Sequence, residues 1–205
     1  DGVFQLESKG MKQVLMRLCP DSIDDVIAAI ALYRPGPMDS IPQYIERRHG
    51  RDKSEYKNPA LERILGKTYG CIVYQEQVME IFREIAGYSL GKADIVRRAM
   101  SKKKASVMEA ERQVFVGGAM ERGMTEADAV ALFEDMASFA SYAFNKSHAA
   151  SYAVLCYETA YLKAHYMSEY MAALLTSVLG DFGKTAAYIG ECTKAGIAVL
   201  PPDIN

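Results

Sequence analysis

The chain has 205 residues and half of them are hydrophobic, which is enough to bury the core of one large domain or two small ones. Its 24 lysines and arginines are balanced by 26 aspartates and glutamates, so the formal net charge is −2. That balance excludes a chain that is basic throughout, and any attraction to nucleic acid has to come from local patches of charge.

Apolar residues at helical spacing dominate the first third of the chain. Helices are predicted in order over 11–18, 23–30, 41–45 and 59–65. Ser8 is placed to cap the first of them, and the motif Arg34–Pro37 ends the second because proline lacks the N–H that a helix needs. A polar loop is predicted over 49–58.

The segment 69–74 is the best strand candidate, because it is rich in β-branched and aromatic residues. It is either extended without a partner or paired with 197–200. Helices then follow over 78–86, 90–100, 106–123, 125–136, 149–165, 169–178 and 184–195. We therefore predict a mainly α fold, a single compact multi-helix domain over 1–205 with at most a minor short β element. A subdivision near 49–58 stays open.

Cysteine usage and hydropathy indicate the compartment. The four cysteines form no Cys-x-x-Cys pair, which favours free thiols in a reducing environment over a metal site or disulfides. No signal peptide and no apolar run of membrane-spanning length is visible, so the sequence predicts a cytoplasmic protein without membrane contact. The chain starts without a methionine, and we expect both ends to be cuts through a longer protein.

A cationic cluster lies at the end of the helix predicted over 90–100. It consists of Arg97, Arg98, Lys102, Lys103 and Lys104. Such charges favour the helix macrodipole, and a run of charge is usually a solvated face. The other interpretation is phosphate binding, in which arginine holds oxygens bidentately and lysine acts as a mobile point charge.

A second group of polar residues stands where the helix over 149–165 begins. Lys146 and His148 precede a helix whose first N–H groups need acceptors, and a bound phosphate or sugar hydroxyl could supply them. Tyr142 belongs either to the core or beside a nucleotide. These residues alone leave the structural and the binding interpretations open.

Ser8 and Arg34 allow two interpretations as well. Ser8 caps a helix whose N–H groups could also hold a template or primer phosphate, and Arg34 is either a rigidly mounted cation for DNA or the partner of a neighbouring acid. No P-loop, dinucleotide fingerprint, His-Glu-x-x-His or Asp-x-Asp motif is present. The chain therefore offers cations for an anion but no evident carboxylate pair for two metal ions.

Several motifs occur in a fixed order along almost the whole chain. They are Gly2–Ser8, Arg34–Pro37, Thr68–Gln77, Ala93–Met100, Phe144–His148, Tyr161–Tyr166 and Pro201–Asn205. Together they resemble the alpha subunit of bacterial DNA polymerase III, the C-family replicative polymerase, in the stretch that matches its fingers domain. Two departures, Ser151 where alanine is common and Met167 where proline is common, lie outside the proposed pocket.

The resemblance implies a role in nucleotidyl transfer. Fingers close over an incoming deoxynucleoside triphosphate (dNTP) and the templating base. The palm, which carries the carboxylates for two Mg²⁺ ions, would lie upstream of Asp1, so no catalytic or metal-binding residue is expected in this chain and the chain alone is expected to be inactive. The implied partners are template–primer DNA and dNTP. The sliding clamp and other replisome subunits would bind through regions outside it, and the phosphoesterase-like domain would be outside as well.

The resemblance also assigns site residues. Those assigned to the dNTP are Arg97, Arg98, Lys146, His148 and Tyr142, and those assigned to DNA or its phosphates are Lys102, Lys103, Ser8 and Arg34. This assignment depends on the convergence of the arginine pair with Lys146 and His148. Two other classes stay open: a non-catalytic helical module that binds nucleic acid, and a helical protein–protein scaffold whose charges are solvated surface.

Overall fold

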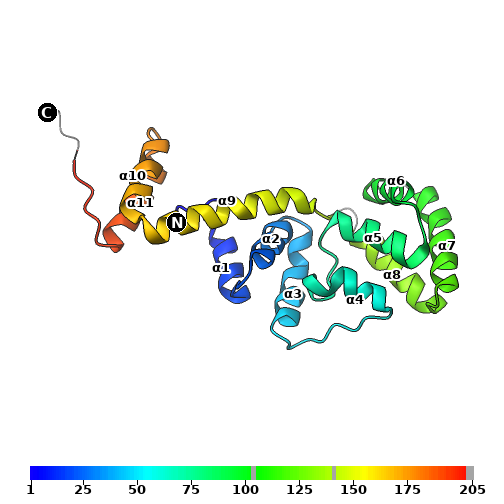
Figure 1. Cartoon of the computed structure of the whole chain (residues 1–205). Coiled ribbons are helices and arrows are strands. Elements are labelled where there is room, and N and C mark those ends of the chain that lie inside the picture. The colour runs from blue at the N-terminus through cyan, green and yellow to red at the C-terminus, as the bar shows by residue number, and fades with distance from the viewer. Residues whose placement is uncertain (103–104, 140–141, 202–205) are drawn as a thin grey trace. The chain divides into compact units, whose positions relative to one another are not determined.

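The computed structural model describes residues 1–102, 105–139 and 142–201 (Figure 1). The helices are α1 (Lys9–Leu18), α2 (Ile23–Leu32), η1 (Pro37–Ser40), α3 (Ile41–Arg48), α4 (Pro59–Leu65), η2 (Gly66–Thr68), α5 (Gln75–Ala86), α6 (Leu90–Ser101), α7 (Ala105–Glu121), α8 (Glu126–Phe139), α9 (Lys146–His165), α10 (Met167–Ser177) and α11 (Phe182–Lys194). Within those ranges the chain forms no β-strand, and Tyr74 and Phe144 form an isolated parallel bridge. The predicted mainly α fold is confirmed.

The first helices begin where polar side chains supply caps. The Ser8 hydroxyl accepts the N–H of Met11 at 3.2 Å, and the Ser22 hydroxyl accepts the N–H of Asp25 at 3.3 Å. Each bond satisfies one of the donors that the first turn of a helix leaves without a backbone partner. The predicted capping role of Ser8 is therefore confirmed.

The strand predicted over 69–74 is wrong. Residues 71–74 belong to no helix or strand. The Phe144 N–H donates to the Val73 carbonyl at 3.1 Å as part of the isolated bridge, and side chains satisfy other groups of this segment. The Gln77 side-chain oxygen accepts the N–H groups of Val73 and Tyr74 at 2.8 and 2.9 Å, and its amide donates to the Thr68 hydroxyl at 2.8 Å. Gln77 and Thr68 are buried, so this network fixes the entry into α5 without a sheet.

The chain forms two compact units. One comprises residues 1–13 and 151–205, and the other comprises residues 14–150. These limits differ from the subdivision near 49–58 that the sequence left open, and a single domain stays a prediction. In the first unit the Glu7 carboxylate accepts the N–H of Gly2 at 2.5 Å and the hydroxyl of Tyr188 at 2.9 Å, which ties the N-terminal segment to α11.

The core of the second unit lies among α4 to α8, which pack side by side (Figure 1). Phe82, Phe115 and Phe133 come from α5, α7 and α8, and their ring centroids are 5.2 to 6.4 Å apart. All three side chains are buried, and aromatic pairs at this spacing add to the free energy gained by burial. This cluster holds α5, α7 and α8 together, and α6, which carries Arg97 and Arg98, packs against α5 and α7.

We expect Gly118→Ala to lower the free energy of unfolding by about 1–3 kcal/mol, because α7 crosses α5 closely at this glycine. A Cβ at residue 118 would lie 2.4 Å from the carbonyl oxygen of Ala86. Gly117→Ala is the matched control, since its Cβ has no atom within 4 Å, and it should stabilise α7 by up to about 1 kcal/mol. Urea unfolding measures both variants, and equal stabilities would contradict the tight crossing.

All four cysteines are free thiols. Cys19 is an exposed free thiol, and Cys71, Cys156 and Cys192 are buried free thiols. In the described part of the chain, no helix combines the length and the apolar character required to cross a membrane.

Candidate functional site

The predicted arginine pair is organised by an acid on the same helix. Arg97 Nη2 lies 2.7 Å from Oδ1 of Asp94, and Arg98 Nη2 lies 2.8 Å from Oδ2 of the same carboxylate. All three residues belong to α6. Hydrogen bonds from Arg97 and then Arg98 lower the pKa of Asp94, which therefore remains a carboxylate. The Arg97 side chain is 13% exposed and that of Arg98 is 69% exposed, so Arg98 is the more accessible cation.

Of the three lysines that follow this arginine pair in the sequence, the structure describes Lys102. Lys102 is an exposed residue that caps α6 just after its last residue, Ser101. Lys103 and Lys104 lie outside the described residues, so their predicted contacts stay predictions.

A second group of predicted residues lines one pocket of about 640 Å³, which we call the Arg34 pocket. The side chains around it include Arg34, Gln75, Tyr142, Phe144, Asn145 and His148. They come from the turn after α2, the start of α5 and the segment that leads into α9. Arg34 from one part of the sequence and Tyr142 and His148 from another therefore share one hollow.

Arg34 contacts the segment before α9 and holds it in position. Its guanidinium carbon lies 3.9 Å from the centre of the Phe144 ring, and Nη2 donates to the Tyr142 carbonyl at 2.9 Å. Nε donates to the Ala31 carbonyl at 3.2 Å, and burial lowers the pKa of the guanidinium. The alternative of an acidic partner for Arg34 is wrong for the described part of the chain, because a ring and two carbonyls hold this cation instead.

We expect Gly36→Ala to destabilise the chain by about 1–3 kcal/mol, because Gly36 has a φ of +100° and faces Tyr142 closely. A Cβ there would lie 2.4 Å from two ring carbons of Tyr142. Gly50→Ala is the control, since its φ of +69° adds strain but nothing lies within 4 Å of its Cβ. Thermal unfolding separates the two, and a smaller loss for Gly36→Ala than for Gly50→Ala would contradict the contact.

The N-terminus of α9 is already capped by protein groups. The Glu76 carboxylate accepts the Lys146 N–H at 3.0 and 3.1 Å and the Asn145 side-chain amide at 3.1 Å. The Asn145 side-chain oxygen accepts the His148 N–H at 2.8 Å. The idea that these N–H groups wait for a phosphate is therefore wrong for Lys146 and His148, and an anion would be recognised by side chains.

Those side chains lie next to aromatic rings. The Lys146 ammonium is 5.3 Å from the centre of the Tyr74 ring, and the exposed His148 ring meets Phe144 edge-on with centroids 5.4 Å apart. Aromatic neighbours fix a cation or imidazole without neutralising it. Neighbouring rings therefore orient both side chains at the start of α9.

The predicted residues fall into separate local groups. Arg97 and Arg98 are gathered around Asp94, whereas Arg34, Tyr142 and His148 line the Arg34 pocket. The convergence of the arginine pair with Lys146 and His148 on one ligand stays a prediction. So does the contact of Ser8 with DNA, since its hydroxyl is engaged in capping α1.

The sequence interpretation missed three residues that position the site. Asp94 carried a signal, because an acid three and four residues before two arginines matches the spacing of ion pairs on a helix. For Glu76 and Gln75, no feature of the sequence indicated a contact with α9 or with the segment before it. Gln75 donates its side-chain amide to the Ala143 carbonyl at 3.0 Å and its N–H to the Phe144 carbonyl at 2.9 Å.

Comparison with known proteins finds relatives that share the name DNA polymerase III subunit alpha. A family described as "Bacterial DNA polymerase III alpha subunit finger domain" matches residues 1–123. The chain is 52% identical over 209 residues to DNA polymerase III subunit alpha of Thermus aquaticus, covering 100% of this chain and 17% of that protein. It is 50% identical to the subunit of Deinococcus radiodurans, covering 100% and 16%, and 48% identical to that of Pasteurella multocida, covering 99% and 18%. The chain thus spans less than a fifth of these relatives.

Proposed function

This chain belongs to the finger-domain family of the bacterial DNA polymerase III alpha subunit, and from that premise we propose that it binds the incoming dNTP and template–primer DNA in a DNA-directed DNA polymerase. The observation that carries the proposal is about 50% identity to named alpha subunits over the whole chain. The proposed cellular location is the cytoplasm. The sliding clamp and other replisome subunits are proposed to bind elsewhere on the alpha subunit.

The cationic groups would bind the triphosphate. Arg98 presents an exposed guanidinium, and Asp94 orients it together with Arg97 on one side of α6. A guanidinium can hold two phosphate oxygens at once, and Lys146 would add a point charge. Charge stabilisation on the departing β,γ-phosphates and orientation of the α-phosphate are the contributions proposed for these side chains.

The Arg34 pocket would receive the nucleoside. Tyr142 is 41% exposed, so one part of its ring is accessible to a base. His148 lies on the same pocket and offers a ring nitrogen to the sugar or to a phosphate. Arg34 is engaged with Phe144 and two carbonyls, so its contribution to DNA binding would be indirect, through the position of Tyr142. Lys102, Lys103 and Ser8 are proposed to meet DNA phosphates.

The Mg²⁺ ions of such a reaction are proposed to bind outside this chain. Among the described residues, no group of three or more histidine, cysteine, aspartate or glutamate side chains could hold a metal ion. The isolated chain is accordingly proposed to be inactive in primer extension.

Titration of the whole alpha subunit with a labelled dNTP, with and without primer–template, tests the proposed function. Tighter dNTP binding in the presence of primer–template is the expected result, because the template base and the pocket would bind the nucleotide together. DNA binding that weakens steeply with salt and ignores dNTP would instead indicate a non-catalytic DNA-binding module. Absence of both responses would indicate a protein–protein scaffold.

A further inference from the structure

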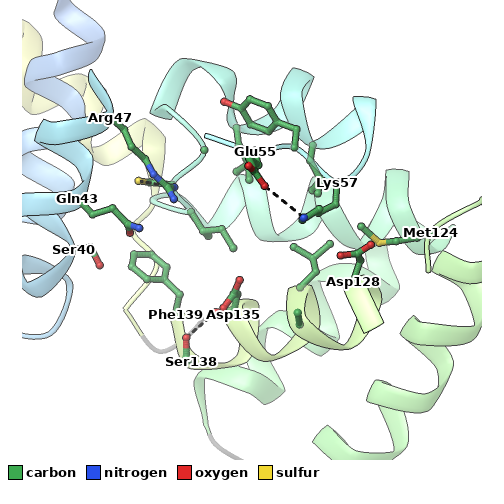
Figure 2. A pocket seen from close by; sticks show the side chains of 18 residues that line it. Ser40, Gln43, Arg47, Glu55, Lys57, Met124, Asp128, Asp135, Ser138 and Phe139 are labelled. Atoms are coloured by element: carbon green, nitrogen blue, oxygen red, sulfur yellow. Dashed lines mark hydrogen bonds and ion pairs between the residues drawn. The ribbon is translucent and has the colours of Figure 1, made fainter. Parts of the chain in front are cut away.

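A second pocket, of about 430 Å³, lies in the second unit among α3, the loop after it, α4 and α8. We call it the Asp135 pocket (Figure 2). The residues assigned to dNTP or DNA do not line it, and its volume falls in the range typical of small-molecule sites. It is therefore a distinct feature of the chain that the proposed polymerase function does not use.

The floor of the Asp135 pocket is apolar. Leu61 and Leu65 of α4 and Leu132 of α8 are buried residues of the main core that also face this hollow. Phe139, at the end of α8, adds an aromatic side chain to the same wall (Figure 2). Such a floor favours a ligand with a hydrophobic body, which would be removed from water on binding.

Most charges around the rim already have partners. Arg47 Nε is 2.9 Å from an Asp52 carboxylate oxygen, and Lys57 Nζ is 3.6 Å from Glu55. The carboxylate of Asp128 accepts the hydroxyl of Thr125 at 2.7 Å. Both cations of the rim therefore have acidic partners, and little positive charge on the rim is left unpaired.

Asp135 differs from the other charges on the rim. Within the described ranges no cation pairs with its carboxylate, and Figure 2 shows the side chain on the wall of the pocket near Phe139. Partial burial, with a smaller effect from the neighbouring Glu134, raises the pKa of Asp135. A carboxylate that no cation neutralises gains free energy when a cation approaches.

We propose that the Asp135 pocket binds an organic cation, an amine or guanidinium carried on a hydrophobic body. The hydrophobic part would cover Leu61, Leu65 and Leu132, and the cation would pair with Asp135 on α8. Asp128 lies seven residues earlier on α8, about 10 Å along the helix, so it adds negative potential without competing for the same position. Arg47 on α3 already pairs with Asp52, so the ligand cation would lie toward α8 rather than toward α3.

Three probes that share one apolar body but differ in charge test this proposal on the whole alpha subunit. They are 4-phenylbutylamine, 4-phenylbutan-1-ol and 4-phenylbutyrate, and calorimetry or ligand-observed NMR measures their dissociation constants. The amine should bind most tightly and the carboxylate least tightly. Asp135→Asn should weaken amine binding about fivefold, which is the size of a partly exposed charge pair, and leave the alcohol unchanged.

Two further variants control the location. Glu134→Gln changes the adjacent acid, which pairs with Arg112 at 3.4 Å and does not line the pocket, and it should leave amine binding unchanged. Ala131→Trp fills the mouth of the pocket from an exposed position on α8 and should abolish binding of the amine and the alcohol. Equal affinity for the three probes, unchanged amine binding by Asp135→Asn, or no binding at all would overturn the proposal, and none of these outcomes bears on dNTP binding.

Discussion

Replacing Arg48 by methionine will lower the free energy of unfolding by about 3–5 kcal/mol, because it leaves a buried carboxylate without its cation. Asp25 of α2 receives Arg48 Nε at 3.1 Å and Nη2 at 2.9 Å. The Asp25 side chain is 2% exposed and that of Arg48 is 9% exposed. Water therefore cannot replace the lost hydrogen bonds, and the methionine fills only the space of the arginine stem.

The loss should depend on pH in a defined direction. Burial opposes ionisation of Asp25, but the hydrogen bonds from Arg48 and from the Asp21 N–H outweigh it, so the pKa of Asp25 is lowered in the folded chain. A lowered pKa contributes stability above the unfolded value, about 3.9 for aspartate, and this contribution disappears as the pH falls through the folded value. The difference between wild type and Arg48→Met should therefore be largest near neutral pH and shrink below about pH 4.

Arg51→Met is the matched control for this prediction. Arg51 pairs with Glu46 at 3.2 Å near the end of the same helix, but its side chain is 65% exposed and that of Glu46 is 41% exposed. An exposed pair contributes less than about 1 kcal/mol. Urea unfolding at pH 7 and pH 3.5 measures both variants, and equal losses for the two arginines would contradict a special role for the buried pair. Asp25→Asn combined with Arg48→Met should recover part of the loss, since no unpaired charge then remains buried.

The helices could be predicted because their signals are local. Apolar spacing and a terminal glycine predicted a helix over 78–86, and the structure ends α5 at Ala86 with Gly87 at a φ of +73°. The strand over 69–74 failed because composition cannot show what satisfies the backbone. The buried Gln77 side chain and the Phe144 backbone take that role, and the left-handed Tyr69 turns the chain just before residue 71.

The residue types of the candidate site could be predicted from the sequence, but the contacts that arrange them in space could be predicted less well. Arg98 and its acidic partner Asp94 lie within one turn of a helix, so spacing alone could have paired them. Glu76 and Lys146 are 70 residues apart, and no local pattern shows that this carboxylate caps α9. Arg34 likewise meets Tyr142 across 108 residues. Contacts between residues that far apart depend on packing, which spacing along the sequence does not encode.

Arg98→Ala in the whole alpha subunit will lower the rate of nucleotide incorporation by about a hundredfold or more, if this guanidinium stabilises charge on the departing phosphates. A charged donor aimed at a developing negative charge is worth about 2.7–4 kcal/mol. The exposed Arg98 side chain can be removed without opening a cavity, and Asp94 keeps Arg97 as its partner. Thermal stability should therefore stay close to that of wild type while incorporation falls.

Rapid-quench measurement of single-nucleotide incorporation gives both the maximal rate and the apparent affinity for dNTP. Arg98→Lys keeps the charge but loses the planar fork, so we expect it to recover part of the rate, with the remaining defect in orientation of the phosphates. Arg83→Ala is the matched control, since Arg83 is an exposed cation on α5 that pairs with Glu84 and lines neither pocket. Incorporation by Arg98→Ala at the rate of Arg83→Ala would mean that the arginine pair is a solvated helix end, and the triphosphate would then have to be assigned to Lys146 and His148 alone.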